Sequence, residues 1–296
     1  MLKNYINSQK KFVLSSLAPI LTLFGLIFAY PIFWAFYISL RDYKLLKRGV
    51  SSFVGFANYL EVIKDKVFQA SFINTIYFTI FYLFLTLVIG LGLAVYINSI
   101  KSKRIQNIIQ VIVFLPVVTI TVSAAFMWKW MYIPQFGLFN YLLSLLDLGS
   151  FRFLNSSNGV IPSIVFMAIW KWVGINVIIF LSGLQSIPEE YYEAARIDGG
   201  TPFSIFRRIT LPLLKPIFEY VIVTTVLAAM QVFTEIFIMT SGGPGTASRS
   251  LAYHIYEVGF KFLKIGEASA VAFLLFAFVL VLTIFQIRVF RREDLY

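Results

Sequence analysis

The ionisable residues inside long apolar runs are the first candidates for chemistry in this sequence. Lys171 stands between two tryptophans, in Trp170-Lys171-Trp172, and Glu219 and Glu235 fall in a later apolar run. A charged group at the centre of a membrane is costly, so such a residue is by default a candidate functional site. Lys171 therefore either belongs to a site within the membrane or extends its ammonium group to the outer interface, between the two aromatic rings.

Glu235 also has two interpretations. It precedes Gly242 by only seven residues, so we expect it near the outer end of its apolar run. That position favours a role in a gate or an interface over contact with a ligand.

The groupings of residues that catalysis requires are missing. The sequence has one histidine, His254, no cysteine, and no cluster of Ser, His and Asp or of carboxylates, which disfavours intramembrane catalysis and excludes cysteine-ligated metals. It also lacks a G-x-x-x-x-G-K-[ST] phosphate loop. Gly242-Gly243-Pro244 has no lysine at the required position and is typical of an external turn that ends an apolar run. We expect no catalytic residue, metal or cofactor in this chain.

The elements that must position these residues are membrane-spanning helices. Apolar residues make up 59% of the 296 residues and charged ones only 13%, against roughly 45–50% and about 25% in soluble domains. A helix crosses the hydrocarbon core with about 20 residues. Six runs qualify or nearly qualify: 12–40, 72–98, 107–128, 160–182, 217–240 and 268–288. Apolar runs of this length predict an all-α fold. Because the sequence has no internal repeat and no linker, it predicts one membrane domain over residues 1–296.

Six spans place both chain termini on the same side of the membrane. Basic residues flank them, at Lys3, Lys10 and Lys11 and again at Arg288, Arg291 and Arg292. The excess of basic residues on the inner side predicts that both termini are cytoplasmic. The net charge of +11 then reflects residues that flank spans rather than a nucleic-acid-binding surface.

The longest predicted internal loop, residues 183–216, contains signals for two short helices. Ser186 is expected to cap the first helix, and Gly199 and Gly200 are expected to end it, both with the positive φ that permits a sharp bend. Such a segment would present a compact knob to a cleft in a partner, or it would be an ordinary interfacial connection.

The second short helix begins with its own start signal. Thr201 followed by Pro202 is typical of a cap and a first helical residue. We expect this helix to extend through Arg208 and to end before Pro212.

The same segment carries a family resemblance. Glu193-Ala194-Ala195, Gly199, Ile209 and Leu211-Pro212 resemble the EAA loop of ABC-transporter permease subunits. The wider pattern is similar to the maltose-type carbohydrate-uptake permeases: Gln185-Ser186-Ile187-Pro188, Asp198-Gly199, Gly242-Gly243-Pro244, Phe53-Val54-Gly55-Phe56-Ala57-Asn58-Tyr59 and Phe136-Gly137-Leu138-Phe139-Asn140. One departure is Gly200, where the family more often has alanine.

The resemblance implies a six-span permease with a cytoplasmic coupling loop. It implies two separate ATP-binding subunits that hold ATP and Mg²⁺, a second permease subunit of a different sequence, and an extracytoplasmic sugar-binding protein. It also implies that the chain lies in the cell membrane of a bacterium or archaeon. The residues expected to couple to the ATPase are Glu193, Ala194, Ala195, Asp198, Gly199, Gly200, Phe203, Phe206, Ile209, Leu211 and Pro212. Glu193 would face basic groups, and Phe203, Ile205 and Phe206 would fill an apolar cleft.

The resemblance also implies a sugar pathway between the spans that flank this loop. The matching positions are Lys171, Trp172, Ile175, Thr225, Ala228, Ala229 and Val232, to which we add Gln231. Trp172 would stack on a sugar ring, whereas the two alanines would equally serve as packing residues between helices. Glu235, Gly242, Gly243 and Pro244 would form an outer gate or loop that contacts the binding protein.

A self-sufficient secondary transporter or channel is the alternative function. That class usually shows inverted repeats, a broken helix or several intramembrane carboxylates. We find none of these signals in the sequence, so the permease interpretation is favoured.

Overall fold

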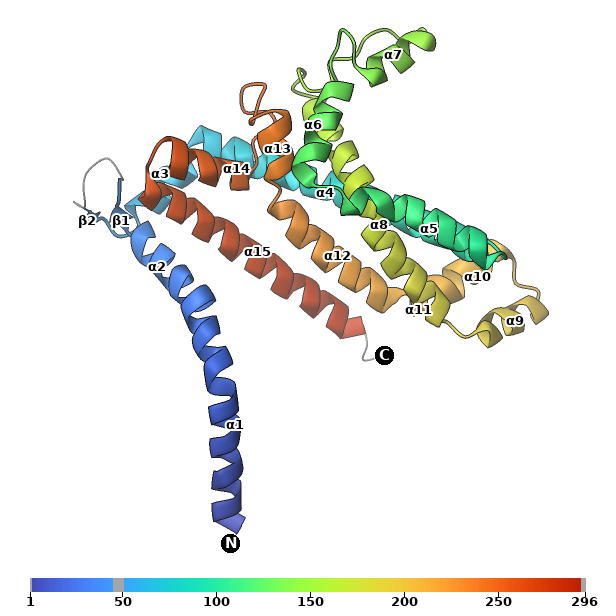
Figure 1. Ribbon diagram of the computed structural model, residues 1–296, viewed down its shortest axis with the longest axis horizontal. Coiled ribbons are helices and arrows are strands. Elements are labelled where there is room, and N and C mark those ends of the chain that lie inside the picture. The colour runs from blue at the N-terminus through green and yellow to red at the C-terminus, as the bar shows by residue number, and fades with distance from the viewer. Residues whose placement is uncertain (1, 45–50, 294–296) are drawn as a thin grey trace. The chain divides into compact units, whose positions relative to one another are not determined.

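The chain is predominantly helical, and the computed structural model describes its residues 2–44 and 51–293 (Figure 1). Contacts gather the chain into two compact units, one made of residues 1–64 and 255–274 and the other of residues 65–254 and 275–296. The predicted all-α fold is confirmed. The single membrane domain over residues 1–296 stays a prediction, and residues 1, 45–50 and 294–296 of it lie outside the described ones.

The first unit begins with a long apolar helix. Its elements are α1 (Leu2–Phe24), the π-helical turn η1 (Gly25–Ala29), α2 (Tyr30–Ser39), the antiparallel strands β1 (Arg41–Asp42) and β2 (Ser52–Phe53), α3 (Ala57–Lys64) and η3 (Glu257–Lys261). The helical stretch Phe12–Ser39 is long and apolar enough to cross a membrane and coincides with the predicted run 12–40. Its large apolar side chains are mostly exposed, as expected of a helix surrounded by lipid.

Asn58 of α3 forms hydrogen bonds with the C-terminal end of α2. Its Nδ2 donates to the carbonyl oxygens of Ser39 (2.7 Å) and Arg41 (2.9 Å), and the hydroxyls of Ser39 and Tyr59 lie 2.6 Å apart. Only 6% of Asn58 is exposed. These bonds satisfy carbonyl groups at and just after the C-terminal end of α2, which no helical N–H reaches. This is a structural reason for the asparagine in the motif Phe53–Tyr59.

The second unit holds most of the other helices. In chain order they are α4 (Lys66–Ser99), α5 (Lys103–Val118), α6 (Thr121–Met131), α7 (Leu138–Leu145), α8 (Val160–Ser186), α9 (Glu189–Ile197), α10 (Pro202–Ile205), the π-helical turn η2 (Phe206–Thr210), α11 (Leu211–Leu213), α12 (Lys215–Met230) and α13 (Thr234–Met239). Residues of α14 (Leu251–Tyr256) and α15 (Ile265–Glu293) belong to both units.

Helix α8 forms the core of the second unit and packs against α4, α5 and α12 (Figure 1). Most of its side chains are buried. Small residues permit the close approach of the helices: a Cβ added at Gly174 would overlap the backbone of Val113 in α5, and Gly90 of α4 lies against Phe180. Such close contact replaces the hydrophobic driving force that lipid-embedded helices lack.

The predicted third span, 107–128, is broken. Helix α5 ends at Val118, α6 begins at Thr121, and the two are bent by 96°. Pro116 lies in the last turn of α5, where proline disrupts the helical hydrogen-bond ladder. Thr119 Oγ1 donates to the Pro116 carbonyl over 2.7 Å, which gives that group a partner outside the helix. The expectation of unbroken spans was wrong at this position.

The predicted fifth span, 217–240, is also interrupted, because α12 ends at Met230 and α13 begins only at Thr234. On its other side, α12 is bent by 66° from the helical segment Pro202–Leu213. Among the described residues, four helices are long and apolar enough to cross a membrane, or up to six if each bent pair forms one span. The bends are what the apolar pattern alone could not reveal.

Candidate functional site

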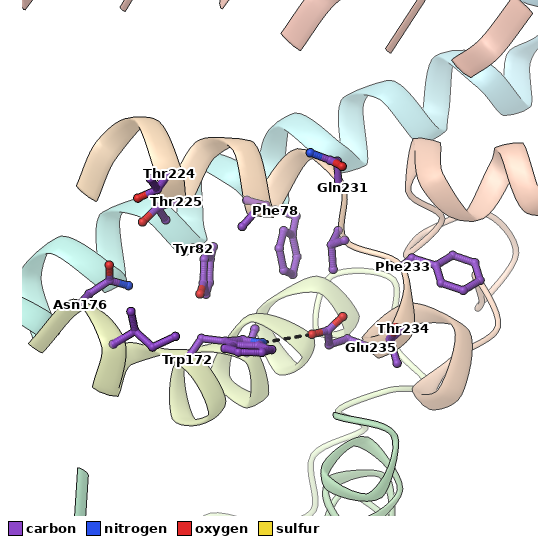
Figure 2. A pocket seen from close by; sticks show the side chains of 15 residues that line it. Phe78, Tyr82, Trp172, Asn176, Thr224, Thr225, Gln231, Phe233, Thr234 and Glu235 are labelled. Carbon is purple, nitrogen blue, oxygen red and sulfur yellow. Dashed lines mark hydrogen bonds between the residues drawn. The ribbon is translucent and has the colours of Figure 1, made fainter. Parts of the chain in front are cut away.

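A cavity of about 420 Å³ lies in the second unit (Figure 2). Four helices, α4, α8, α12 and α13, and the connection between the last two contribute to its wall. The lining residues are Phe78 and Tyr82 from α4; Ala168, Trp172, Ile175 and Asn176 from α8; Thr224, Thr225, Ala228 and Ala229 from α12; and Gln231, Val232, Phe233, Thr234 and Glu235 from the segment that follows α12. The break between α12 and α13 therefore brings non-helical backbone to the cavity, as membrane proteins allow where such backbone lines an internal space.

Every residue predicted to line a pathway borders this cavity except Lys171. The residues brought together are Trp172, Ile175, Thr225, Ala228, Ala229, Gln231 and Val232. Sequence reasoning missed Ala168 and Asn176, although each is four residues from Trp172 and thus on the same helix face. It also missed Phe78 and Tyr82, because the apolar run 72–98 contains no charged residue that would have drawn attention to it.

The side chains of Trp172 and Glu235 point toward each other (Figure 2). Trp172 Nε1 donates to Glu235 Oε1 over 3.5 Å, and only 8% of Glu235 is exposed. Glu235 lies in the first turn of α13, where the helix dipole favours a negative charge. The sequence favoured a gate or interface role for Glu235, but its place in the cavity wall supports the other interpretation, contact with a ligand.

Lys171 is absent from the cavity wall. Its Nζ donates to the carbonyl oxygens of Pro116 (3.1 Å) and Val117 (2.9 Å) at the end of α5, and 1% of the residue is exposed. The ammonium group lies 4.3 Å from the centroid of the Trp172 ring. Both interpretations of Lys171 need correction: it neither lines the cavity nor reaches an interface, because the carbonyls freed by the helix break bind it inside the protein.

The wall of the cavity combines aromatic surface with uncharged polar groups. Figure 2 shows the rings of Phe78, Tyr82 and Trp172 together with the amide of Asn176 and the hydroxyl of Thr225. Aromatic faces offer large contact areas, and amides and hydroxyls both donate and accept hydrogen bonds. A ligand with apolar faces and many hydroxyl groups fits this combination. Among the described residues, no group of acidic, histidine or cysteine side chains could hold a metal ion.

The segment between α8 and α12 folds into short helices joined by an elbow at Gly199. This residue has a φ of +75°, which glycine adopts without strain. The Thr201 side chain then caps α10, since its Oγ1 accepts a hydrogen bond from Ser204 N at 3.3 Å. The elbow at Gly199 and the Thr201 cap both agree with the sequence prediction.

The expected ends of these short helices were wrong. Ser186 does not cap α9: it is the last residue of α8, and its hydroxyl donates back to the Gly183 carbonyl at 2.8 Å. Nor does Pro212 stop the second helix, which continues through η2 and α11 to Leu213. Pro212 lies in α11, directly after the π-helical turn η2 and within this continuous helical segment.

Gly200 departs from its prediction in another way. Its φ is not positive, so the elbow depends on Gly199 alone. Instead, Gly200 N donates to the Ala195 carbonyl at 2.8 Å, and an added Cβ would lie 2.7 Å from that same oxygen. Close approach of the backbone therefore explains glycine at this position.

The elbow exposes apolar side chains next to a carboxylate. Phe203 is 73% exposed and Ile197, which the sequence analysis did not single out, is 85% exposed. Glu193, Ala194, Asp198 and Pro212 are also exposed, while Ala195, Ile205, Phe206, Ile209 and Leu211 are partly buried. Exposed apolar groups gathered on a surface mark a protein interaction site.

The Gly242-Gly243-Pro244 turn follows α13, as expected. Gly242 has a φ of +82°, a conformation that favours glycine. Asn74 of α4 donates through Nδ2 to the carbonyl oxygen of Thr246 at 2.7 Å. The turn is therefore tied to the helix bundle.

Comparison with protein families gives one match over most of the chain. Residues 86–293 fit the model described as "Binding-protein-dependent transport system inner membrane component". The chain is 35% identical to the trehalose/maltose transport system permease protein MalF of Thermococcus litoralis, over 93% of this chain and 92% of that protein. It is 32% identical to the sulfoquinovosyl glycerol transport system permease protein SmoG of Agrobacterium fabrum, over 94% and 90% of the two chains.

A solved structure shares the fold. A chain in the crystal structure of a bacterial ABC transporter involved in the import of the acidic polysaccharide alginate superposes with a TM-score of 0.84. The superposition covers 98% of this chain and 99% of the other, at 23% sequence identity.

Proposed function

Because the chain belongs to the family of binding-protein-dependent transport system inner membrane components, it is a multi-pass membrane permease of an ABC importer, and we propose that its cavity holds a sugar during uptake. The observation that carries this proposal is the cavity wall, where Trp172 and Tyr82 lie close to Asn176 and Thr225. Its volume of about 420 Å³ falls within the roughly 300–1,000 Å³ of small-molecule sites. An oligosaccharide or glycoside fits both the wall and the name of the trehalose/maltose relative.

The partner subunits are part of the same proposal. The chain has no phosphate loop, so two separate ATP-binding subunits would hold ATP and Mg²⁺ and dock on the coupling segment, residues 189–213. Exposed Phe203 and Ile197 supply the apolar contact and Glu193 a carboxylate for basic groups. A second permease subunit, of a different sequence, and an extracytoplasmic sugar-binding protein would complete the importer.

A covalent path connects the coupling segment to the cavity. Pro202–Leu213 continues into α12 through a bend of 66°, and α12 contributes Thr224 and Thr225 to the cavity wall. Closure of the ATP-binding subunits would therefore move a cavity wall as a rigid body, which is one of the common forms of switching transition. This mechanism needs no catalytic residue or cofactor in the permease.

The proposed topology places both chain termini and the coupling segment in the cytoplasm. The turn at residues 242–244 then lies outside, where the binding protein would meet it. The membrane is the cell membrane of a bacterium or archaeon.

Replacement of Phe203 by aspartate tests the docking surface. The tagged chain is purified from its native host in mild detergent, and the proteins that come with it are identified by mass spectrometry. The wild type should bring an ATPase and a second six-span protein, whereas Phe203→Asp should lose the ATPase and keep the second permease. The matched control is Phe136→Asp, because Phe136 is equally exposed, at 73%, but lies in the proposed outer loop. Loss of the ATPase from both variants, or from neither, would contradict the docking surface.

A further inference from the structure

The cavity wall is asymmetric in charge. Among its described lining residues, Glu235 is the one acidic side chain, and no lysine, arginine or histidine accompanies it. The remaining polar groups are the indole N–H of Trp172 and the hydroxyls and amides of Tyr82, Asn176, Thr224, Thr225, Gln231 and Thr234. A ligand in this space therefore meets a carboxylate and no cationic donor.

Lys171, the cation that contacts Trp172, does not line the cavity. Lys171 lies behind the Trp172 ring, with its Nζ 4.3 Å from the ring centroid. Its donors are directed to the carbonyl oxygens of Pro116 and Val117, at 3.1 and 2.9 Å. The ammonium group is thus no direct partner for an anion in the cavity, whereas Glu235 borders it.

The carboxylate of Glu235 has capacity for further hydrogen bonds. Its contact with Trp172 Nε1, at 3.5 Å, is longer than the 2.7–3.2 Å typical of N–H···O bonds. An ionised carboxylate offers about four acceptor positions and no donor. Hydroxyl or ammonium groups can fill those positions, whereas a sulfonate, a second carboxylate or a doubly ionised phosphate has no donor to fill them.

We infer that Glu235 determines the charge class of the substrate: the cavity takes uncharged sugars and amino sugars and rejects anionic ones. An anionic group beside Glu235 would suffer like-charge repulsion in a space where water screens poorly, and repulsion against the wrong ligand is a common source of specificity. The inference rests on the proposed function, since it names the class of sugar for the same cavity. It separates this chain from a transporter of an acidic polysaccharide, such as the one whose fold it shares.

Three probes that differ at one position test the inference. Trehalose, trehalose 6-phosphate and 6-amino-6-deoxytrehalose have the same two rings with a neutral, negative or positive group. Their binding to the complete importer in lipid nanodiscs, without nucleotide or binding protein, is measured by saturation-transfer NMR titration. The wild type should bind the phosphate at least about tenfold more weakly than trehalose, and the amine at least as tightly as trehalose.

Variants of the cavity wall test whether Glu235 causes the preference for trehalose over its phosphate. Glu235→Gln should reduce the preference for trehalose over its phosphate to less than about threefold, whereas Glu235→Asp, which keeps the charge, should retain it. Thr224→Val changes the same wall without changing its charge and should also retain it. A Glu235→Gln complex that binds trehalose and still rejects the phosphate as strongly as wild type would overturn the inference and leave the sugar cavity intact. Binding of none of the probes by the wild type would overturn both.

Discussion

The ammonium group of Lys171 lies 2.9 Å from the carbonyl oxygen of Val117, fifty-four residues earlier in the chain. A second bond, to the Pro116 carbonyl, places the cation at the C-terminal end of α5, where the helix dipole is negative. The charge and the helix break thus stabilise each other: the break frees the carbonyls, and the carbonyls stabilise a buried lysine. This pairing explains how a cation can occupy the middle of an apolar helix without belonging to a ligand site.

Lys171→Met should destabilise the permease without altering which sugars it takes. Methionine fills a similar volume but donates no hydrogen bond, so the carbonyl groups of Pro116 and Val117 lose their charged partner. We expect the free energy of unfolding to fall by roughly 1–3 kcal/mol, seen as a lower melting temperature of the purified complex. Lys129→Met is the control, because Lys129 donates one bond of 3.0 Å to the Ile238 carbonyl from a less buried position. An equal or larger effect of the control would contradict this account.

The sequence predicts which residues line the cavity better than it predicts where the helices begin and end. Trp172 and Thr225 were found because the family resemblance implies these positions, and that does not depend on where a helix bends. The partner of Lys171 could not be found in this way, because hydropathy does not reveal that α5 stops at Val118 or that the freed carbonyls point toward α8. Phe78 and Tyr82 were missed because an unbroken apolar run looks the same whether it faces lipid or a cavity.

The coupling segment could also be predicted only in part from the sequence. The positive φ of Gly199 and the cap at Thr201 follow from local chemistry, and both are observed. The failure of Ser186 to cap a helix depends on how far α8 extends, which tertiary packing decides.

Asn58→Leu should weaken the end of the first apolar helix. The asparagine side chain bonds the carbonyls of Ser39 and Arg41, and leucine would leave both without this donor in a site that is 6% exposed. The expected cost is about 1–3 kcal/mol, measured by thermal unfolding of the purified protein. Asn107→Leu, at an exposed position, should cost little. Full stability of Asn58→Leu would show that these bonds do not hold the junction.

Gly199→Val should uncouple ATP hydrolysis from uptake. The φ of +75° disfavours a β-branched residue by roughly 1–2 kcal/mol, and no atom lies within 4 Å of an added Cβ, so the effect comes from the backbone rather than from a clash. In proteoliposomes that contain the whole importer, we expect transport per ATP hydrolysed to fall by about tenfold. Gly199→Asn is the control, because asparagine tolerates this conformation. Normal uptake by Gly199→Val would refute the elbow as a lever.

Trp172→Ala should raise the KM for sugar uptake more than it changes kcat. The indole borders the cavity and approaches Glu235 through Nε1, so its removal takes away a flat stacking surface and a donor that orients the carboxylate. Loss of a buried aromatic contact of about 1.5–3 kcal/mol predicts an increase in KM of at least about tenfold. Trp172→Phe keeps an aromatic ring but not the N–H, so it separates the two contributions. A KM close to wild type would assign the effect to stacking. A KM as high as in Trp172→Ala would assign it to the bond with Glu235. If Trp172→Ala instead lowered kcat at an unchanged KM, Trp172 would act in the conformational change, and the cavity would lose its main evidence as a sugar site.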